Sequence, residues 1–431
     1  MSRRGLERRA FLAAAAAFGL GARFPAIAAP LDARPIVERR TIDDLVRNDP
    51  GEVARIRSAY ANMFAWSAAH PNDPRSWAQQ RRLHARAAER GQTDPAFMIH
   101  GSHHFFPWHR AYLYFHERIL AWHLAGQTIP DPSFRLPVWG WETSLDGLND
   151  PTMYTEPRDR AGHPNPLYHA RRFASFESSD TDCRTALTFG GRDFFGYPPT
   201  LGASNNGSIE NGVHADVHVD VGGDMGRIVT AANDPLFFAH HANIDRLWSW
   251  WSALPGATAA ATFAEWRSAT WQFPDWDGSL VTVRSSDLLD HDERLRYRYG
   301  KPSVTFFAPR DAREGSLVRL GSRWHTPHAV RLQASAAKRV ALKLLDVRVP
   351  GPGLFTVAAI VPEQSPTPLV LGTFIVFEHH MVARANAYLD VTEVRTALLH
   401  PAGIRLVLMP DPHTPRLVEL EASQGYLRMA H

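Results

Sequence analysis

Residues 99–120 read IHGSHHFFPWHRAYLYFHERIL, and residues 234–248 read DPLFFAHHANIDRLW. Seven of the 22 histidines lie between His84 and His123, and four more lie between His214 and His241. In both stretches the histidines alternate with apolar and aromatic residues at helical spacing, which predicts buried helices that carry imidazole groups. Imidazole is the commonest metal ligand in proteins, so two such clusters predict a site for more than one metal ion.

The chain around the first stretch predicts further helices. Apolar residues recur at helical spacing up to Phe64, and prolines then end the pattern. A second helix is predicted over 75–90 with Gly91 as its stop signal, and a third is predicted to begin near Pro107. Residues 126–212 are rich in Gly, Pro, Asn and Asp, so they predict loops and short elements.

The second stretch has its own helix signals. Asp234 followed by Pro235 is the favoured order at a helix start, and the helix is predicted to run to about Ala253. His214 and His218 are four residues apart, which places both rings on one face of a helix. A donor set of imidazoles without thiolates suits copper or zinc, and the residues alone leave both metals open.

After about residue 300 the pattern changes to apolar, β-branched runs separated by Pro and Gly turns. This pattern predicts a β-rich second domain. One helix is expected inside it, capped by Asp390 and running from Val391 to Leu399.

Composition excludes several classes of protein. With 431 residues and 44% hydrophobic residues, the chain is long and apolar enough for a large folded core. Its one cysteine, Cys183, rules out an internal disulfide and any Cys-ligated zinc or iron–sulfur site. The sequence contains no basic patch with interleaved aromatic residues, so no nucleic-acid partner is predicted.

The first 28 residues predict a targeting signal. Arg8-Arg9-Ala10-Phe11-Leu12 resembles a twin-arginine motif, an uncharged run follows, and Ala26-Ile27-Ala28 is a small-x-small cleavage pattern. The predicted location is therefore periplasmic or secreted, with the twin-arginine export machinery as a partner. Removal of this segment takes away five arginines and one glutamate, which changes the formal charge from +3 to −1. The mature chain is predicted to have no membrane span.

Residues 99–120 resemble the first copper signature of the tyrosinase/polyphenol oxidase family of type-3 copper proteins, and residues 234–248 resemble the second. DPRSWAQQRRLHA at 73–85 and GSIENGVHADVH at 207–218 resemble family segments that carry further ligands. Tyr297-Arg298-Tyr299 resembles the tyrosine motif that closes the catalytic domain. The β-rich tail resembles the C-terminal domain of the plant-type enzymes, and the export signal suggests a bacterial source.

The resemblance implies two copper ions, each held by three histidines. The implied ligands of the first ion are His84, His100 and His109, and those of the second are His214, His218 and His241. Four other histidines match family positions that are not ligands, and they are interpreted as supporting or packing residues: His103, His104, His116 and His240.

Further positions are expected to tune reactivity. Glu210 stands where the family has the acid that holds a water near the metals, and Ala215 stands where strong monophenol oxidisers often have Asn. Ile228 replaces a Phe that gates the first copper in many plant enzymes, so a more open cavity is expected. Phe237 is expected to lie beside His241. Asp245 matches the Asp of the HHxxxDR pattern and is expected to orient a ligand ring.

The chain also departs from the plant pattern. No cysteine lies near His84 or His100, so the His–Cys thioether of the plant enzymes cannot form. The N-terminal disulfides of those enzymes are absent as well. The lone Cys183 is interpreted as a small buried hydrophobic residue.

The expected fold class is α+β, with a mainly α catalytic domain built on a four-helix-bundle dicopper core. A β-rich, sandwich- or barrel-like C-terminal domain follows. The predicted boundaries are a signal peptide at 1–28, a catalytic domain at 29–300, a linker at 301–335 and the C-terminal domain at 336–431. By resemblance the last domain would plug the active-site entrance, and the plain alternative is that it covers an apolar face.

The implied activity is oxidation of o-diphenols to o-quinones by O₂, with ortho-hydroxylation of monophenols as a further activity. The expected partners are small phenolic substrates and O₂. Three alternatives remain open: an oxygen-binding protein similar to haemocyanin, an o-aminophenol oxidase and a zinc hydrolase.

Overall fold

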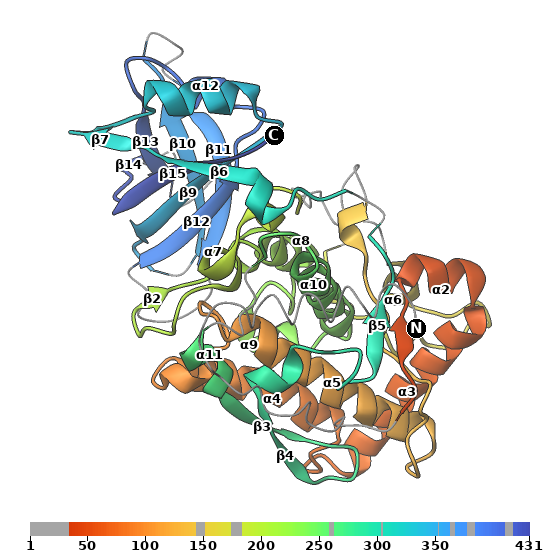
Figure 1. Ribbon diagram of the computed structural model, residues 1–431. Helices are drawn as coiled ribbons and strands as arrows, with labels where there is room; N and C mark the ends of the chain where they lie inside the picture. The colour runs from red at the N-terminus through yellow and green to blue at the C-terminus, as the bar shows by residue number, and fades with distance from the viewer. Residues whose placement is uncertain are drawn as a thin grey trace, which may run out of the picture.

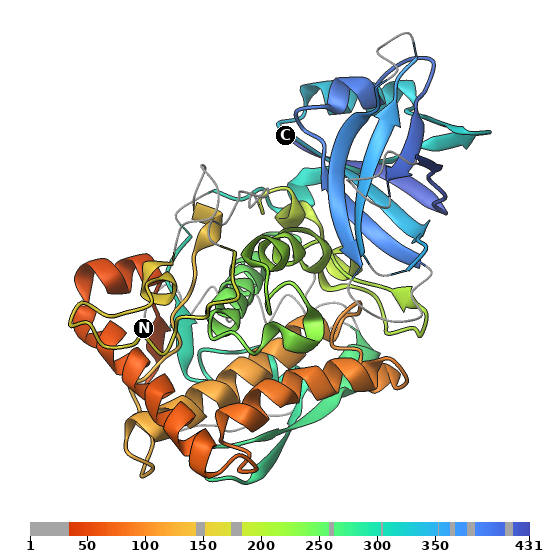
Figure 2. The same cartoon turned by 180° about the vertical axis from the view of Figure 1, so that it is seen from behind.

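The computed structural model describes residues 34–143, 151–173, 183–257, 263–302, 305–351, 353–362, 367–376, 384–409 and 417–431. These residues form a helical part, which contains both His-rich stretches, and a β-rich part at the C-terminal end (Figures 1 and 2). The predicted α+β class is therefore confirmed. The predicted signal peptide at 1–28 lies outside the described residues.

The long helices begin where the sequence provides caps. Asp49 accepts a hydrogen bond from the backbone N–H of Glu52 at the start of α3, and Ser76 accepts one from Gln79 at the start of α4. The main helices are α2 (Ile42–Asn48), α3 (Pro50–Ala69), α4 (Trp77–Gly91), α5 (Phe105–Leu124), α8 (Ala215–Val221) and α10 (Leu236–Ser252).

Helices α5 and α10 form the centre of the helical part. Nearly all of their residues are buried, because other elements surround them on every side. The start of α10 agrees with the sequence to within one residue, and Asp234 Oδ1 accepts a hydrogen bond from the N–H of Leu236 at 2.8 Å. Its predicted end near Ala253 is confirmed.

Short elements connect these helices. The short helices are α6 (Thr152–Thr155), α7 (Gly191–Phe195), α9 (Ile228–Ala231) and α11 (Ala264–Ser268), with a π-helical turn at Glu210–His214 before α8. Two small sheets complete the helical part: β1 (Val37–Arg39) with β5 (Tyr297–Tyr299), and β3 (Thr270–Pro274) with β4 (Leu280–Arg284). The parallel pair β1–β5 joins the two ends of this part of the chain.

The β-rich part has two main sheets. Their strands are β6 (Ala312–Ser316), β9 (Arg339–Arg348), β10 (Gly353–Ile360), β11 (Leu369–Val376), β12 (Arg384–Asp390), β13 (Arg405–Met409), β14 (Val418–Glu419) and β15 (Gln424–Ala430). One sheet has the order β2-β12-β9-β15-β6, in which β2 is the short strand Ala203–Ser204, and the other has the order β11-β10-β13-β14. Apolar residues of both sheets share one hydrophobic cluster, and the described strands form no closed barrel.

Residues 312–336 contain regular structure. They form β6, the hairpin β7 (Val318–Leu320) with β8 (Arg323–His325), and α12 (His328–Ala336). These elements lie within the segment predicted as a linker, and the domain boundaries stay a prediction.

The helix predicted from Val391 to Leu399 is wrong for most of its length. Helix α13 covers only Arg395–Leu398. Asp390 ends strand β12, and the N–H of Val391 pairs with the carbonyl of Val340 at 2.9 Å, so the sheet pairing continues where the helix was expected.

The two parts of the molecule share a strand. Strand β2 (Ala203–Ser204) comes from the helical part and pairs in parallel with Arg384 and Ala385 of β12. Figure 1 shows β2, α7 and the end of α8 on the side of the helical part that faces the blue sheets. Among the described residues, no helix combines the length and apolar character that crossing a bilayer requires.

Candidate metal centre

Three histidines from different segments form the first cluster. His84 lies on α4, His109 lies on α5, and His100 lies in the segment that leads into α5. One ring nitrogen from each of the three histidines lies within 4.8 Å of the corresponding nitrogens of the other two. All three residues are buried, so a metal ion held there would be shielded from bulk water.

Four histidines form the second cluster. His214 ends the π-helical turn, His218 lies on α8, and His240 and His241 lie on α10. Their ring nitrogens lie within 4.8 Å of one another, and all four residues are buried. Geometry alone therefore offers one more imidazole than a three-histidine site uses.

A hydrogen bond from Trp141 distinguishes His240 from the other three histidines of this cluster. The indole Nε1–H of Trp141 donates a hydrogen bond to Nδ1 of His240 at 3.0 Å. A neutral imidazole that accepts at Nδ1 carries its proton on Nε2, so Nε2 has no lone pair for a metal. This contact supports the prediction that His240 is not a ligand, and no sequence signal pointed to Trp141.

Among the other histidines of the two clusters, three rings are held with the proton on Nδ1. Nδ1 of His109 lies 2.8 Å from the Phe105 carbonyl, Nδ1 of His214 lies 3.0 Å from the Glu210 carbonyl, and Nδ1 of His218 lies 2.8 Å from the Met225 carbonyl. A carbonyl only accepts, so each Nδ1 carries the proton and each Nε2 offers its lone pair.

The two clusters face each other across stacked rings. His109 and His241 are stacked with centroids 4.4 Å apart, and Phe237 lies 4.1 Å from His241, as the sequence predicts. Nε2 of His218 lies 3.2 Å from Nε2 of His241. This contact is a hydrogen bond whose donor depends on the tautomer of His241, and the same two nitrogens are close enough to coordinate one metal ion.

Burial keeps these imidazoles neutral. It lowers the pKa of His109 to about 3 and that of His218 to about 4, and it lowers the pKa values of His84, His214 and His241 well below 6.5. Neutral imidazole is the form that binds metals, so no deprotonation opposes binding near pH 7.

The donor chemistry fits copper. Among the described residues, neither cluster contains a thiolate or a carboxylate, and an all-imidazole set suits copper or zinc. Nε2 of His84 and Nε2 of His109 are buried without a hydrogen-bond partner in the described part of the chain. These two nitrogens are therefore available to bind a metal ion.

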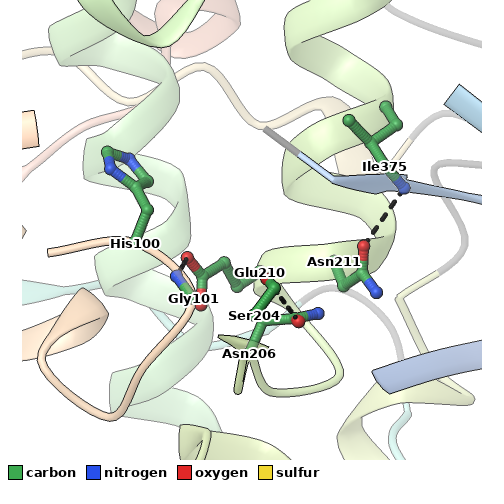
Figure 3. Close-up of a pocket in the computed structure, with 7 residues that line it drawn as sticks. All are labelled: His100, Gly101, Ser204, Asn206, Glu210, Asn211 and Ile375. Carbon is green, nitrogen blue, oxygen red and sulfur yellow. Dashed lines mark hydrogen bonds between the residues drawn. The ribbon is translucent and has the colours of Figure 1, made fainter. Parts of the chain in front are cut away.

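Glu210 lies beside the first cluster in a small polar cavity (Figure 3). Its Oε1 accepts a hydrogen bond from the N–H of Gly101 at 2.7 Å, and its Oε2 has no partner among the described atoms. Burial raises the pKa of this carboxyl well above 4.5. His100 and Ile375 of strand β11 line the same cavity, so the β-rich part reaches the predicted water-binding acid.

A second cavity lies between the two clusters. It measures about 10 Å³ and is lined by His84, His100, His214, His218, Met225, Ile228 and Ala231. This volume holds one water-sized sphere and no phenol ring. Ile228 therefore borders an enclosed space rather than an open one, and its effect on substrate access stays a prediction. Ala215 is buried directly after His214.

The contacts of Asp245 differ from the prediction. Its carboxylate pairs with Arg110 and Arg39 and accepts hydrogen bonds from the hydroxyls of Tyr297 and Tyr299, both at 2.6 Å. These groups come from α5, β1 and β5, so Asp245 joins three elements rather than orienting a ligand ring. The sequence missed Arg39, whose guanidinium also pairs with buried Glu117 at 2.8 Å.

The other predicted supporting histidines are buried. His116 is stacked on Phe238 with centroids 3.6 Å apart, and its Nδ1 lies 3.1 Å from Oε1 of Gln80. His103 and His104 pack against each other, and burial lowers their pKa values to about 4 and about 3. Cys183 is buried, in agreement with its interpretation as a small hydrophobic residue.

Comparison with known proteins shows the same two signatures. Residues 74–186 and 177–254 match the common central domain of tyrosinase. The chain is 32% identical over 325 residues to the latent form of polyphenol oxidase from Prunus armeniaca, which covers 65% of this chain and 50% of that protein. It is 36% identical over 269 residues to polyphenol oxidase A1 from Vicia faba, covering 53% and 42%. The chain thus spans about half the length of these relatives.

Solved structures agree with the fold. Latent apple tyrosinase aligns with a TM-score of 0.63 and 23% identity over 94% of this chain and 97% of that one. Polyphenol oxidase from Grenache (Vitis vinifera) aligns with a TM-score of 0.50 and 29% identity over 65% of this chain and 93% of that one. A tyrosinase domain holds a type-3 dicopper centre, and the two clusters provide its site in this chain.

The comparison overturns the predicted location. Both of these relatives are plant proteins that are named as chloroplastic. This finding contradicts the predicted periplasmic or secreted location, and it gives no support to a bacterial source. An N-terminal segment rich in Arg and poor in acidic residues is also typical of organelle transit peptides. The composition of residues 1–28 therefore does not distinguish between these kinds of signal.

Proposed function

We propose that the chain is a member of the tyrosinase and polyphenol oxidase family with a plant-type C-terminal domain, and that it is a dicopper oxidase that converts o-diphenols to o-quinones with O₂. The observation that carries this proposal is the pair of buried imidazole clusters, whose rings stack on each other and whose ring nitrogens lie close together.

The proposed ligands are His84, His100 and His109 for one copper ion and His214, His218 and His241 for the other. When bound, the two ions supply activation of O₂ and accept the two electrons that the diphenol loses. The backbone carbonyls of Phe105, Glu210 and Met225 orient three of the rings, so the chain fixes the ligands before the metal arrives.

Glu210 is proposed to take the phenol proton through a water in its cavity. Burial raises the pKa of its carboxyl above that of an exposed glutamate, so its carboxylate is the stronger base of the two. Nothing in the side chain of Ala215 can help to polarise that water. We therefore expect oxidation of diphenols to exceed hydroxylation of monophenols.

This expectation gives the first test. A monophenol should be oxidised more slowly than its catechol counterpart and after a lag. Ala215→Asn should raise the ratio of monophenol to diphenol initial rates by about tenfold, because its amide can hydrogen-bond to the water. Ala215→Leu fills similar space without an amide and is the control. Equal rates without a lag in the unmodified protein would contradict the assignment.

The C-terminal part is proposed to keep the enzyme latent. Asn211, next to Glu210, accepts a hydrogen bond from the N–H of Ile375 at 3.1 Å and donates one to the carbonyl of Asn386. These bonds hold strands β11 and β12 against the π-helical turn that carries Glu210. The same bonds place Ile375 in the lining of the cavity beside Glu210.

Lys343 supplies a second contact between the two parts. Its buried ammonium lies 2.9 Å from Asp193 of α7 and 2.9 Å from Glu314 of β6. We expect Lys343→Gln to raise basal catechol oxidation about tenfold, because a loss of about 1.4 kcal/mol in interdomain attraction changes the open population tenfold. Lys338→Gln, at an exposed position of the same part, is the control. Unchanged activity with full copper content would contradict latency.

One observation favours a second candidate, an oxygen-binding protein. The cavity of about 10 Å³ between the clusters has no room for a phenol ring. Copper analysis and O₂ uptake separate the candidates. The oxidase binds two copper ions per chain and consumes O₂ with catechol, whereas a carrier binds O₂ reversibly and leaves catechol unchanged. A chain that binds only zinc and consumes no O₂ would favour a hydrolase, and o-aminophenol belongs in the substrate panel.

A further inference from the structure

The turn after α8 controls the ring of His218. This turn spans residues 222–226, and its Met225 carbonyl lies 2.8 Å from Nδ1 of His218. Because this contact fixes both the tautomer and the rotation of the ring, the position of the turn decides where Nε2 of His218 points.

Asp224 connects this turn to the segment at residues 169–172, which is distant in the sequence. It is buried, and its Oδ2 lies 2.8 Å from Nε2 of His169 while its Oδ1 lies 3.1 Å from Arg171. The hydroxyl of Thr230 donates a hydrogen bond to the carbonyl of Asp224 at 2.8 Å. Asp224 is therefore held on its side chain and on its backbone, directly before Met225.

Gly222 and Gly223 of the turn lie directly against residues 171–173. A Cβ on Gly223 would lie 2.1 Å from the carbonyl oxygen of Arg171, and one on Gly222 would lie 2.3 Å from the ring of Phe173. Both glycines have positive φ, and the N–H of Phe173 donates to the carbonyl of Val221 at 2.9 Å. Only glycine allows this approach, so the turn is seated directly on the segment.

The same segment also holds the start of α10. Nε of Arg172 lies 2.7 Å from Oδ2 of Asp234, and its Nη2 lies 2.5 Å from Oδ1. Asp234 also accepts a hydrogen bond from the N–H of Leu236, the first residue of α10, the helix that carries His241. Such a bidentate guanidinium–carboxylate pair fixes geometry as well as adding energy.

We propose that residues 169–172 are the positioning element of the second copper site. The segment sets the distance between the turn behind His218 and the first turn of the helix that bears His241. His169 and Asp224 are its positioning residues, since they act on His218 through the Met225 carbonyl. This inference rests on the proposed function, because it requires that His218 and His241 bind copper.

The test measures copper retention. His169→Leu and Asp224→Ala each remove the contact at the turn, and we expect the chelator concentration that strips the second copper ion to fall about tenfold while the first ion is retained. His169→Gln keeps an N–H donor that can reach Asp224 and should restore the normal midpoint. Copper per chain is measured by atomic absorption across a chelator series, with a thermal melt of each variant.

A matched control is the exposed pair of His163 and Asp159, whose Nδ1 and Oδ2 lie 3.3 Å apart. His163→Leu removes this contact, as His169→Leu does at the turn, and should leave both midpoints unchanged. If His169→Leu, at a partly exposed position, folds and holds both ions as tightly as the unmodified protein does, the positioning role is wrong. If the unmodified protein binds fewer than two copper ions, the proposed function itself fails.

Discussion

Replacing His241 with glutamine should leave one firmly bound copper ion per chain and slow catechol-dependent O₂ uptake by at least about a thousandfold. Nε2 of His241 lies 3.2 Å from Nε2 of His218, and its ring is stacked on His109 of the other cluster. His241 therefore connects both proposed sites. Diphenol oxidation needs both ions to accept two electrons, so losing one ion removes the reaction rather than weakening it.

His240 provides the matched control because it is adjacent, equally buried and in the same cluster. In His240→Gln the amide oxygen can accept the hydrogen bond that Trp141 donates to Nδ1, so this variant should retain two copper ions. Copper per chain and O₂ uptake are measured for both variants. If His240→Gln loses a copper ion and His241→Gln keeps two, the ligand assignment moves to His240.

The local features of this protein could be predicted from its sequence. The histidines of both clusters occur in stretches whose helical periodicity and caps are encoded within a few residues, such as Ser76 before α4 and Asp234 before α10. The β-rich part was predictable for the same reason, since its strands are continuous apolar runs. These signals are short-range, so they do not depend on what the chain packs against.

The remaining features depend on contacts between distant residues. Trp141 donates a hydrogen bond to His240 across 99 positions, and Asp224 meets His169 across 55. Asn211 bonds to strands more than 160 residues later. No local pattern specifies which partners meet, and a helix predicted at 391–399 fails for the same reason, because Val391 pairs with Val340.

Asp245 shows how such contacts redirect a residue. Its position one turn after His241 predicted a bond to a ligand ring. Instead the carboxylate pairs with one arginine from β1 and one from α5, and it accepts hydrogen bonds from two tyrosines of β5. A buried guanidinium needs a carboxylate far more than a neutral imidazole does, so the arginines decide where Asp245 points.

Asp245→Ala should therefore destabilise the protein strongly, by about 3–5 kcal/mol in the free energy of unfolding. Arg39 would keep its pair with Glu117, but Arg110 would retain only backbone carbonyls, such as that of Leu288, and would become a buried cation without a carboxylate. Urea unfolding of the helical part measures the change. Glu89→Ala removes the carboxylate of an exposed residue of α4 and should change stability by at most about 0.5 kcal/mol.

The pH dependence of stability should follow the same network. Its buried charges hold the pKa of Asp245 below 3.8, despite the opposing effect of burial. A carboxyl with a lowered folded-state pKa stabilises the protein above its unfolded-state value, near pH 4, and this stabilisation is lost as the pH falls through the folded-state value. Asp245→Ala should therefore flatten the acid limb of the stability curve. If the variant keeps normal stability but releases copper more easily, Asp245 acts on the ligands and not as the joint between β1, α5 and β5.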